Sequence, residues 1–432
     1  MLVITWEKKM MSRYLLLFLL LASFLPASAQ NTDRHIRERK VRKVLSTLSS
    51  DDMQGRKPLT PGIDKAAAFI SSEFARVGLK PLQPGGGYLQ SFSTSGATVR
   101  QQSLYLNDVQ VAPSDLISFP SEEEIDWSGT GAEIVRLKKQ GGNAIQEFLP
   151  LLQGKKNLLV LADTSLRRDL SRLRNFRMQR MSDAGTVILA FHPDPVDRYR
   201  ARVSSTIRRF SYANVVGVIP GKGRPDERVV FSSHYDHLGI GKAVGQDSIY
   251  NGANDDASGT TAVIALARYF SKGKQPERTL VFAAFTAEES GGYGSQYFSK
   301  QMPPEKVVAM FNVEMIGTES KWGRNSAYIT GYEKTDFGKI LQGDLAGTGF
   351  TFHPDPYPAQ NLFYRSDNAT LARLGVPAHT ISTSKMDSEK FYHTVDDELA
   401  TLDTKNMTAI IKAIAISSRS IVEGRNTPSR VQ

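Results

Sequence analysis

Carboxylate and imidazole side chains follow three apolar segments in the second half of the chain. The segments and the polar residues after them are 228–233 with His234 and Asp236, 279–285 with Glu288 and Glu289, and 307–313 with Glu314. Continuous apolar segments of this kind are typical of strands buried on both faces of a sheet. Because ligands bind at the carboxyl edge of open α/β sheets, we expect these side chains to gather at one edge.

Two loop segments add further candidates. Asp255 lies in the segment 251–259 that enters a predicted helix, and His393 precedes the last predicted helix. Each has an ordinary structural explanation, since Asp255 could cap the helix and His393 could be a surface residue. The adjacent carboxylates of Glu288 and Glu289 are harder to explain in that way, because they repel each other at the end of an apolar strand unless a cation lies between them.

Composition limits the chemistry that this cluster could support. The chain has 432 residues, of which 40% are hydrophobic and 23% charged, with a net charge of +10. These fractions are typical of a globular protein and exclude extensive disorder or a fibre. The absence of cysteine excludes a thiol nucleophile, an iron–sulfur cluster and a disulfide scaffold. Any metal site must therefore use nitrogen and oxygen ligands, a set suited to zinc or another divalent ion.

The elements that would position these residues alternate between strands and helices. From residue 213 onward we expect strands at 214–219, 228–233, 279–285, 307–313 and 378–382, and helices at 258–270, 293–300, 334–345, 367–374 and 404–422. Earlier in the chain, helices are expected at 36–45 and 63–77. This alternation predicts an α/β fold whose sheet is covered by helices on both faces.

The middle of the chain has a different pattern. Residues 95–212 contain short predicted strands, among them 158–161 and 187–191, and we interpret them as a β-rich module inserted into the α/β domain of 30–94 and 213–432. Residues 160–209 carry 11 Arg and 5 Asp, and the arginines of 167–180 are expected on a helix. Without interleaved aromatic residues this charge favours a solvated surface over nucleic-acid binding.

The first 29 residues have the pattern of a secretory signal peptide. A basic stretch with Lys8, Lys9 and Arg13 precedes the apolar residues 15–25, and Ala-Ser-Ala follows at 27–29. A basic region, an apolar core of about 7–15 residues and small residues at the cleavage site define such peptides. We expect export to the periplasm or the medium, and no membrane span after cleavage.

Together these segments resemble the zinc aminopeptidases of peptidase family M28. The resemblance is carried by 48–56 (LSSDDMQGR), 234–239 (HYDHLG), 252–259 (GANDDASG), 287–289 (AEE), 312–317 (NVEMIG) and 392–394 (YHT). It implies the zinc exopeptidase fold, with a mixed, mostly parallel sheet flanked by helices on both faces. The position of 95–212 is similar to that of the protease-associated domain of many members.

The resemblance also implies two zinc ions and a ligand set. The carboxylate of Asp255 would bridge the two ions. The peptide bond between Asp255 and Asp256, in the turn that enters the helix, would be cis. The remaining ligands would be His234 and Glu314 for one ion, and Glu289 and His393 for the other.

The resemblance further assigns roles to residues around the ions. Glu288 would be the general base that activates a metal-bridged hydroxide, and Tyr392 would donate a hydrogen bond to the oxyanion. The carboxylate of Asp236 would fix the tautomer of the ligand histidine. Arg365 and Asp367 resemble residues that line the substrate pocket.

One position departs from the family pattern, which has Asp where this chain has Glu314. The extra methylene extends the side chain by about 1.5 Å. Zinc–oxygen bonds of about 2.0–2.2 Å leave little slack, so either the strand end adjusts or the second ion binds more weakly.

The expected function is that of an exported aminopeptidase acting on peptides with a free N-terminus. Alternatives on the same fold are a carboxypeptidase-like activity, which would need a cationic clamp, and a glutaminyl cyclase-like activity, which uses a single zinc ion. A non-catalytic binding protein is a further alternative. A serine hydrolase is not supported, because the chain lacks a Gly-x-Ser-x-Gly nucleophile motif.

Overall fold

The computed structural model describes residues 32–138, 143–175 and 178–432. The chain divides into two compact units, one formed by residues up to Gln90 together with Ala213–Gln432, and the other by Ser91–Tyr212. Strands β2 (Leu89–Leu106) and β10 (Tyr199–Ile219) contribute residues to both units. The signal peptide predicted at 1–29 lies outside the described residues. Within the described parts, no helix combines the length and apolar character needed to cross a bilayer.

The first unit is built on a mixed sheet, which confirms the predicted fold class. Its strands run in the order β17-β16-β18-β15-β11-β14-β10. In this unit β11 is parallel to β14 and β15, β15 is parallel to β18, and β16 is parallel to β17. β10 and β16 run antiparallel to their neighbours β14 and β18, and the short strand β1 (Lys80–Pro81) pairs antiparallel with β10. The bounds are β11 (Arg224–His234), β14 (Arg278–Phe285), β15 (Val307–Glu314), β16 (Ser326–Ile329), β17 (Thr351–Pro354) and β18 (Ala378–Ser382).

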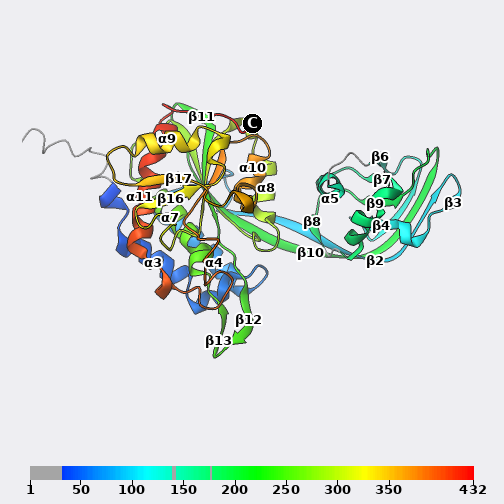
Figure 1. The fold of residues 1–432 in the computed structure, drawn as a ribbon, viewed down its shortest axis with the longest axis horizontal. Helices are drawn as coiled ribbons and strands as arrows, with labels where there is room; N and C mark the ends of the chain where they lie inside the picture. The colour runs from blue at the N-terminus through cyan, green and yellow to red at the C-terminus, as the bar shows by residue number, and fades with distance from the viewer. Residues whose placement is uncertain (1–31, 139–142, 176–177) are drawn as a thin grey trace, which may run out of the picture. The chain divides into compact units, whose positions relative to one another are not determined.

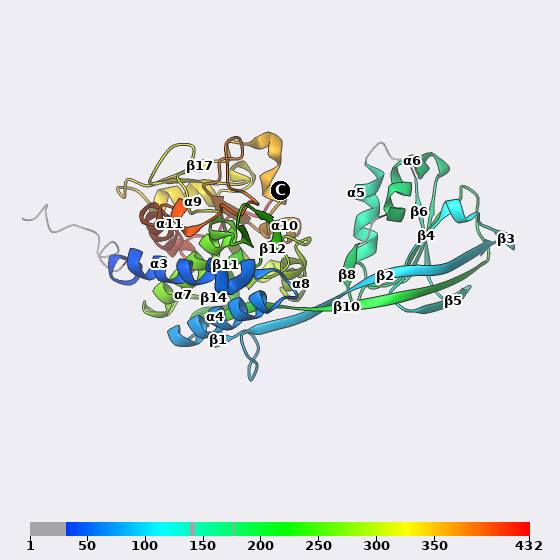
Figure 2. The same ribbon diagram turned by 90° about the horizontal axis from the view of Figure 1, so that it is seen from below.

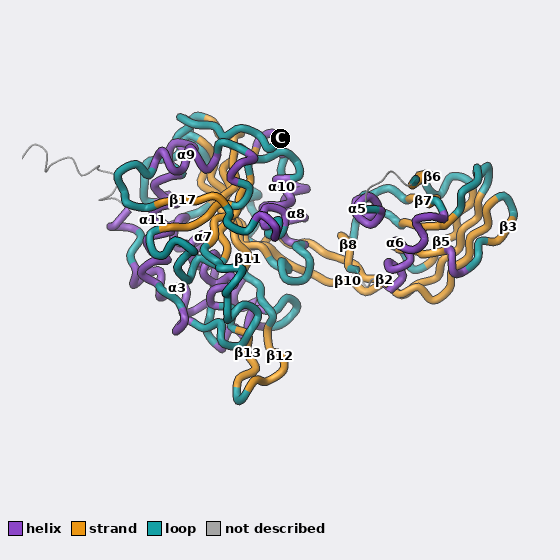
Figure 3. The backbone as a smooth tube through the Cα atoms, in the orientation of Figure 1, coloured by secondary structure: helices purple, strands orange, loops and turns teal. Residues whose placement is uncertain are grey.

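Helices cover both faces of this sheet (Figures 1 and 3). Successive residues of β11 alternate between the two cores, with Val229 and Phe231 in one and Val230 in the other. Phe231 stacks on Phe282 and Phe311 from the neighbouring strands. The helices of the larger core are α3 (Glu38–Leu48), α4 (Pro61–Val77), α7 (Gly259–Ser271), α9 (Phe337–Asp344) and α11 (Thr404–Ser417), and those of the smaller core are α8 (Tyr293–Gln301) and α10 (Asn368–Ala372).

The second unit contains a four-stranded sheet in the order β4-β9-β7-β6, packed with short helices (Figure 2). Its elements are β4 (Leu116–Phe119), β6 (Glu133–Leu137), β7 (Leu158–Ala162), β9 (Val187–Phe191), α5 (Ala144–Phe148) and α6 (Arg167–Leu170). Apolar clusters cover both faces of this sheet. The unit therefore has a mixed α/β core and more helix than the predicted β-rich module. Its relation to the protease-associated domain stays a prediction.

The Arg-rich helix predicted at 167–180 is wrong in extent. The α-helix ends at Leu170, and Arg180 lies in β8 (Gln179–Met181). The Arg180 guanidinium is buried and donates to the main-chain oxygens of Leu152, Gly185, Phe119 and Pro120. Burial lowers its pKa to about 10. This arginine satisfies loop carbonyls, so not all of the positive charge is a solvated surface.

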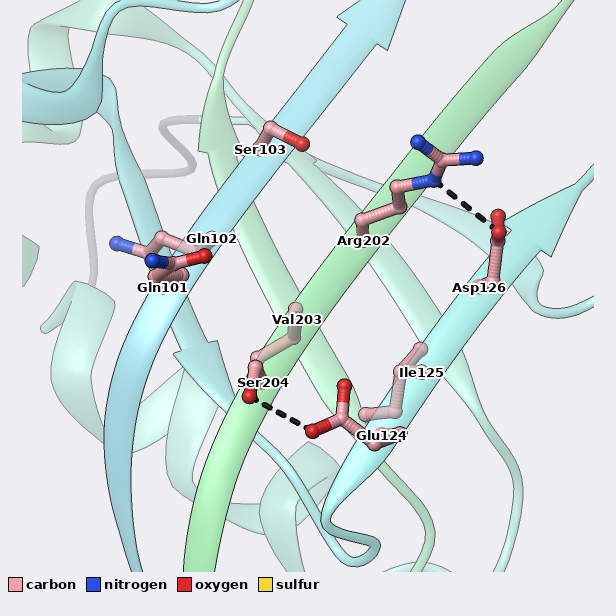
Figure 4. Close-up of a pocket in the computed structure, with 9 residues that line it drawn as sticks. All are labelled: Gln101, Gln102, Ser103, Glu124, Ile125, Asp126, Arg202, Val203 and Ser204. Carbon is pink, nitrogen blue, oxygen red and sulfur yellow. Dashed lines mark hydrogen bonds and ion pairs between the residues drawn. The ribbon is translucent and has the colours of Figure 1, made fainter.

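A hollow of about 730 Å³ in the second unit lies over β2, β5 (Glu124–Ser128) and β10 (Figure 4). Its polar side chains pair with each other, Arg202 with Asp126 and Ser204 with Glu124. The residues that line it include no histidine and no group of carboxylates facing one another. The predicted chemistry therefore belongs to the first unit.

Candidate metal centre

The polar residues that follow β11, β14 and β15 meet at one edge of the sheet, because these three strands are parallel neighbours. Among the described residues, two groups of possible ligand atoms lie there. Within each group, the atoms are all within 4.8 Å of one another. We name them the Glu314 position and the Glu289 position, and they share Asp255. The groups are His234, Asp255 and Glu314, and His237, Asp255, Glu289 and His393.

The Glu314 position is formed by the ends of two strands. His234 Nε2 lies 3.2 Å from both Asp255 Oδ1 and Glu314 Oε1. The Ser366 hydroxyl donates to Glu314 Oε2 at 2.5 Å. The longer side chain of Glu314 therefore reaches the imidazole and is held by a hydroxyl. Met315, the next residue, has a positive φ of 48° at the end of the strand.

The Glu289 position combines the turn after β14 with the loop before α11. His393 Nε2 lies 3.3 Å from Asp255 Oδ2 and 3.2 Å from Glu289 Oε2. His237 was not predicted, although it follows the His234-Tyr-Asp motif directly. Its Nδ1 lies 2.9 Å from Glu289 Oε1. Both His393 and Ala287 adopt positive φ, a conformation that non-glycine residues adopt mainly at functional sites and turns.

The shared carboxylate of Asp255 is fixed by its backbone. Asp397 accepts hydrogen bonds from the main-chain N–H groups of Asn254 and Asp255, at 2.8 and 3.0 Å. Asp256 Oδ1 accepts from the N–H groups of Gly259 and Met315. The Asp255–Asp256 peptide bond is cis, as the family resemblance implied. The hydrogen bonds of Asp256 connect the turn that carries Asp255 to the end of the strand that carries Glu314.

Arg56 explains why the segment 48–56 belongs to the motif pattern. Its guanidinium is fully buried and donates to four main-chain oxygens, those of Leu48, Tyr235, Asn251 and Gly252. Burial lowers the pKa of Arg56, and the carboxylates around the site oppose that shift. The cation therefore joins the loop between His234 and Asp236 to the loop that leads into Asp255.

The electrostatics of the site favour the binding of positive charge. Burial raises the pKa of Glu288 well above its ordinary value, and nearby carboxylates add to the shift. Burial likewise raises the pKa of Asp236 to about 7. Burial also opposes ionisation of Asp255, but hydrogen bonds from His234 and His393 outweigh it and hold the pKa of Asp255 well below its usual range. The donor set of imidazoles and carboxylates and this excess of buried carboxylates fit a pair of divalent cations.

Comparison with known proteins identifies the segment that carries these residues. Residues 214–417 match the model described as peptidase family M28. This segment belongs to peptidase family M28. Over 110 residues the chain is 34% identical to a probable zinc metalloprotease of Leptosphaeria maculans, which covers 25% of each chain. Over 226 residues it is 27% identical to a probable leucine aminopeptidase of Trichophyton verrucosum, covering 50% of this chain and 57% of the relative.

Structural comparison agrees on the fold. An aminopeptidase from Aneurinibacillus sp. has a TM-score of 0.54 and 18% identity, over 91% of this chain and 96% of that chain. The sequence matches, by contrast, span 25% and 57% of the two curated relatives. The M28 fold is therefore established for the first unit, and the activity is argued below from the site.

The carboxylate of Asp236 differs from its predicted role in this M28 site. His234 Nδ1 lies 3.1 Å from the main-chain oxygen of Asp236, whereas the Asp236 carboxylate is 3.8 Å away. The carboxylate instead accepts from the N–H groups of Glu288 and Glu289, at 3.1 and 3.4 Å. The main chain orients the histidine, and the carboxylate positions the two glutamates.

A cavity of about 100 Å³ opens beside the M28 centre. Arg365, predicted to bind substrate, and Tyr392, predicted to donate to the oxyanion, both line it, and Tyr392 stacks on His393 with ring centroids 3.8 Å apart. Asp367 does not line it, because the residue is buried at 2% exposure, and its charge helps to raise the pKa of Glu288. The cavity residues are Asp255, Glu288, Glu289, Glu314, Met315, Tyr328, Thr330, Leu362, Arg365, Ser366, Thr380, Ser382, Ser384, Met386 and Tyr392.

Proposed function

We propose that the protein is a zinc-dependent aminopeptidase that removes N-terminal residues from peptides. The observation that carries the proposal is the convergence of His234, Asp255, Glu289, Glu314 and His393 into two groups that share Asp255. Membership of family M28 and the aminopeptidase named among the structural neighbours support it. The same groups would hold two zinc ions, one at the Glu314 position and one at the Glu289 position.

When bound, a pair of divalent ions would polarise the scissile carbonyl and lower the pKa of a water molecule. The residues of the chain supply the rest of the chemistry. Glu288 lines the cavity beside the shared Asp255, and its turn is fixed by Asp236. In the proposed mechanism Glu288 removes a proton from the attacking water and delivers it to the leaving amine.

Tyr392 is proposed as the donor to the developing oxyanion. Its ring stacks on His393, so the side chain lies against the Glu289 position, and it also lines the cavity. Although Tyr392 is 43% exposed, desolvation of its hydroxyl and the surrounding carboxylates raise its pKa above the ordinary range, so the hydroxyl keeps its proton and can donate it. Donors that face a developing charge in a partly dry site are among the largest contributors to catalysis.

The cavity supports a preference for uncharged, apolar N-terminal side chains. Met315, Leu362 and Met386 supply apolar surface. The hydroxyls of Thr380 and Ser382 form hydrogen bonds within the protein, to Asn368 and to the main chain of Met315. The free α-amine of a substrate would lie beside the carboxylates at the metal end of the cavity, which restricts cleavage to the first residue.

We propose in addition that the protein is exported and that residues 1–29 are removed as a signal peptide. The basic, apolar and small-residue regions of this segment support the proposal. The mass of the protein recovered from the periplasm or the medium of an expressing cell tests it. A mature chain that begins near residue 30 is the expected result.

The test of the proposed activity combines zinc analysis with the variant Glu288→Gln. The wild type is expected to bind two zinc ions and to cleave free peptides but not amino-blocked ones. Glu288→Gln should keep both ions and lose about 10²–10⁴-fold in kcat, the usual contribution of a general base. A single bound ion, or equal cleavage of blocked peptides, would instead favour the cyclase-like or carboxypeptidase-like alternatives.

A further inference from the structure

His237 is a buried imidazole at the Glu289 position with no role in the mechanism above. Its side chain is fully buried, and Nδ1 lies 2.9 Å from Glu289 Oε1 and 3.8 Å from Asp255 Oδ2. We propose that His237 is a positioning residue, which donates Nδ1–H to Glu289 and orients that carboxylate toward the second zinc ion. The inference rests on the proposed two-zinc site.

Hydrogen-bond accounting favours this role over direct coordination. Nε2 of His237 is buried and has no hydrogen-bond partner among the described residues. If Nδ1 bound an ion, the ring proton would sit on Nε2 as a buried donor without an acceptor, which is rare in proteins. Ligand histidines almost always donate their other N–H to a partner. With the proton on Nδ1, the N–H group donates to Glu289, and only the lone pair of Nε2, an acceptor, remains unpaired.

The surroundings fix the ring in this orientation. A Cβ on Gly252, which has φ +54°, would lie 2.5 Å from the Cγ and Cδ2 atoms of His237. The ring of His393 lies edge-on, with centroids 5.6 Å apart. The main-chain N–H of His237 donates to the oxygen of Arg56 at 3.3 Å. The imidazole is therefore packed between the Asp255 loop and the other histidine of this position.

The consequence is that one oxygen of Glu289 is held by His237. Oε1 accepts from His237 at 2.9 Å, while His393 Nε2 lies 3.2 Å from both Oε1 and Oε2. A carboxylate held at one oxygen by a fixed donor loses little further side-chain freedom when an ion binds at the other. Hydrogen-bond partners of this kind typically change metal affinity by about 10–100-fold.

Three variants of His237 distinguish the loss of its hydrogen bond to Glu289 from the loss of side-chain volume and from the loss of a zinc ligand. Asn places its side-chain nitrogen near the position of Nδ1, Gln places it closer to the position of Nε2, and Ala removes the donor. We expect zinc titrations against a competing chelator to show two ions in the wild type. His237→Ala and His237→Gln should weaken one of them about 10–100-fold, and His237→Asn should restore it to within a few-fold.

Zinc X-ray absorption of the loaded proteins provides the second readout. The number of imidazoles bound per zinc should be the same in wild type and His237→Asn. Loss of one imidazole in His237→Asn would show that His237 is a ligand and would overturn the positioning role. Unchanged affinity in His237→Ala, with circular dichroism like that of wild type, would also overturn it. A wild type that binds no zinc would instead refute the proposed function itself.

Discussion

The two halves of the metal centre hold their glutamates in different ways. At the Glu289 position the carboxylate faces His237, a fully buried ring packed between two loops. At the Glu314 position it faces the hydroxyl of Ser366, on an irregular segment that lines the cavity. Glu314 is also the more exposed carboxylate, with a side-chain exposure of 19% against 10% for Glu289.

This difference predicts unequal affinity for the two ions. The Ser366 hydroxyl accepts from the Asn312 side chain but can still rotate about its C–O bond, whereas the His237 ring has one orientation in its packed site. The side that pre-orients its carboxylate should bind its ion more tightly, because less side-chain freedom is lost on binding. We therefore expect the Glu289 position to retain zinc and the Glu314 position to exchange it more readily.

The largest effect is expected for Asp255→Ala, because this carboxylate belongs to both positions. Removing it should abolish tight zinc binding at both positions and reduce turnover below about a thousandth of wild type, since the metal chemistry is lost. Zinc content after dialysis is the measurement. Asp387→Ala is a suitable control, because Asp387 bonds to Tyr357 outside the ligand groups. Full zinc occupancy in Asp255→Ala would contradict the bridging role.

A matched pair of variants tests the predicted inequality directly. Glu314→Ala and His393→Ala each remove one ligand from one position and leave Asp255 in place. Each should retain about one zinc ion per chain at saturating metal. The ion that remains in Glu314→Ala occupies the better oriented position, so it should be lost more slowly to a chelator than the ion in His393→Ala. The reverse order of release would reject the comparison.

The strands that carry the site could be predicted because their apolar segments end abruptly at polar residues. The strands expected at 228–233, 279–285, 307–313 and 378–382 all lie within observed strands. β16 and β17 were missed, since Ser326–Ile329 and Thr351–Pro354 are short and mix polar with apolar residues. The helix expected at 404–422 is interrupted at Ser418, where α11 ends and α12 (Arg419–Val422) begins.

The site was less predictable where side chains act through the main chain. His237 lies within the motif 234–239, but only the packed loops show that its ring faces Glu289. Asp397 supports Asp255 from 142 residues away through two backbone hydrogen bonds, and no local pattern marks it. Asp367 was predicted in the pocket because 365–367 resembles a pocket-lining segment of the family, yet its side chain is buried and does not line the cavity.

Ser366→Ala should produce a smaller effect, limited to the Glu314 position. The variant removes the hydroxyl that donates to Glu314 Oε2 and leaves every ligand in place. The weaker of the two zinc affinities should fall about tenfold, at the low end for such partners. Ser382→Ala is a matched control, because its hydroxyl lies in the same cavity but contacts the main chain of Met315 and Ser384. An equal loss at both positions would show that Ser366 acts on the whole site.

The smallest effect concerns the stability of the metal-free protein. Burial raises the pKa of Asp236 to about 7 and the pKa values of Asp367 and Asp397 to about 6. The same carboxyls have pKa values near 3.9 in an unfolded chain. Between about pH 8 and pH 4 the folded protein therefore binds more protons than the unfolded one, and its stability should rise as the pH falls.

One buried histidine, His379, opposes this rise in stability at lower pH, and it acts only below about pH 6.5. Burial lowers the pKa of His379 to about 4, so below about pH 6.5 the unfolded chain takes up a proton that the folded state refuses. The urea midpoint measured in chelator should therefore rise from pH 8 to pH 6.5, and below pH 6.5 the histidine should offset only about one of the three carboxyls, so the rise continues toward pH 5. With saturating zinc the slope should reverse, because protons compete with the ions for the same ligands. A metal-free midpoint that falls from pH 8 to pH 6.5 would mean that the buried carboxylates are already neutralised by something other than protons.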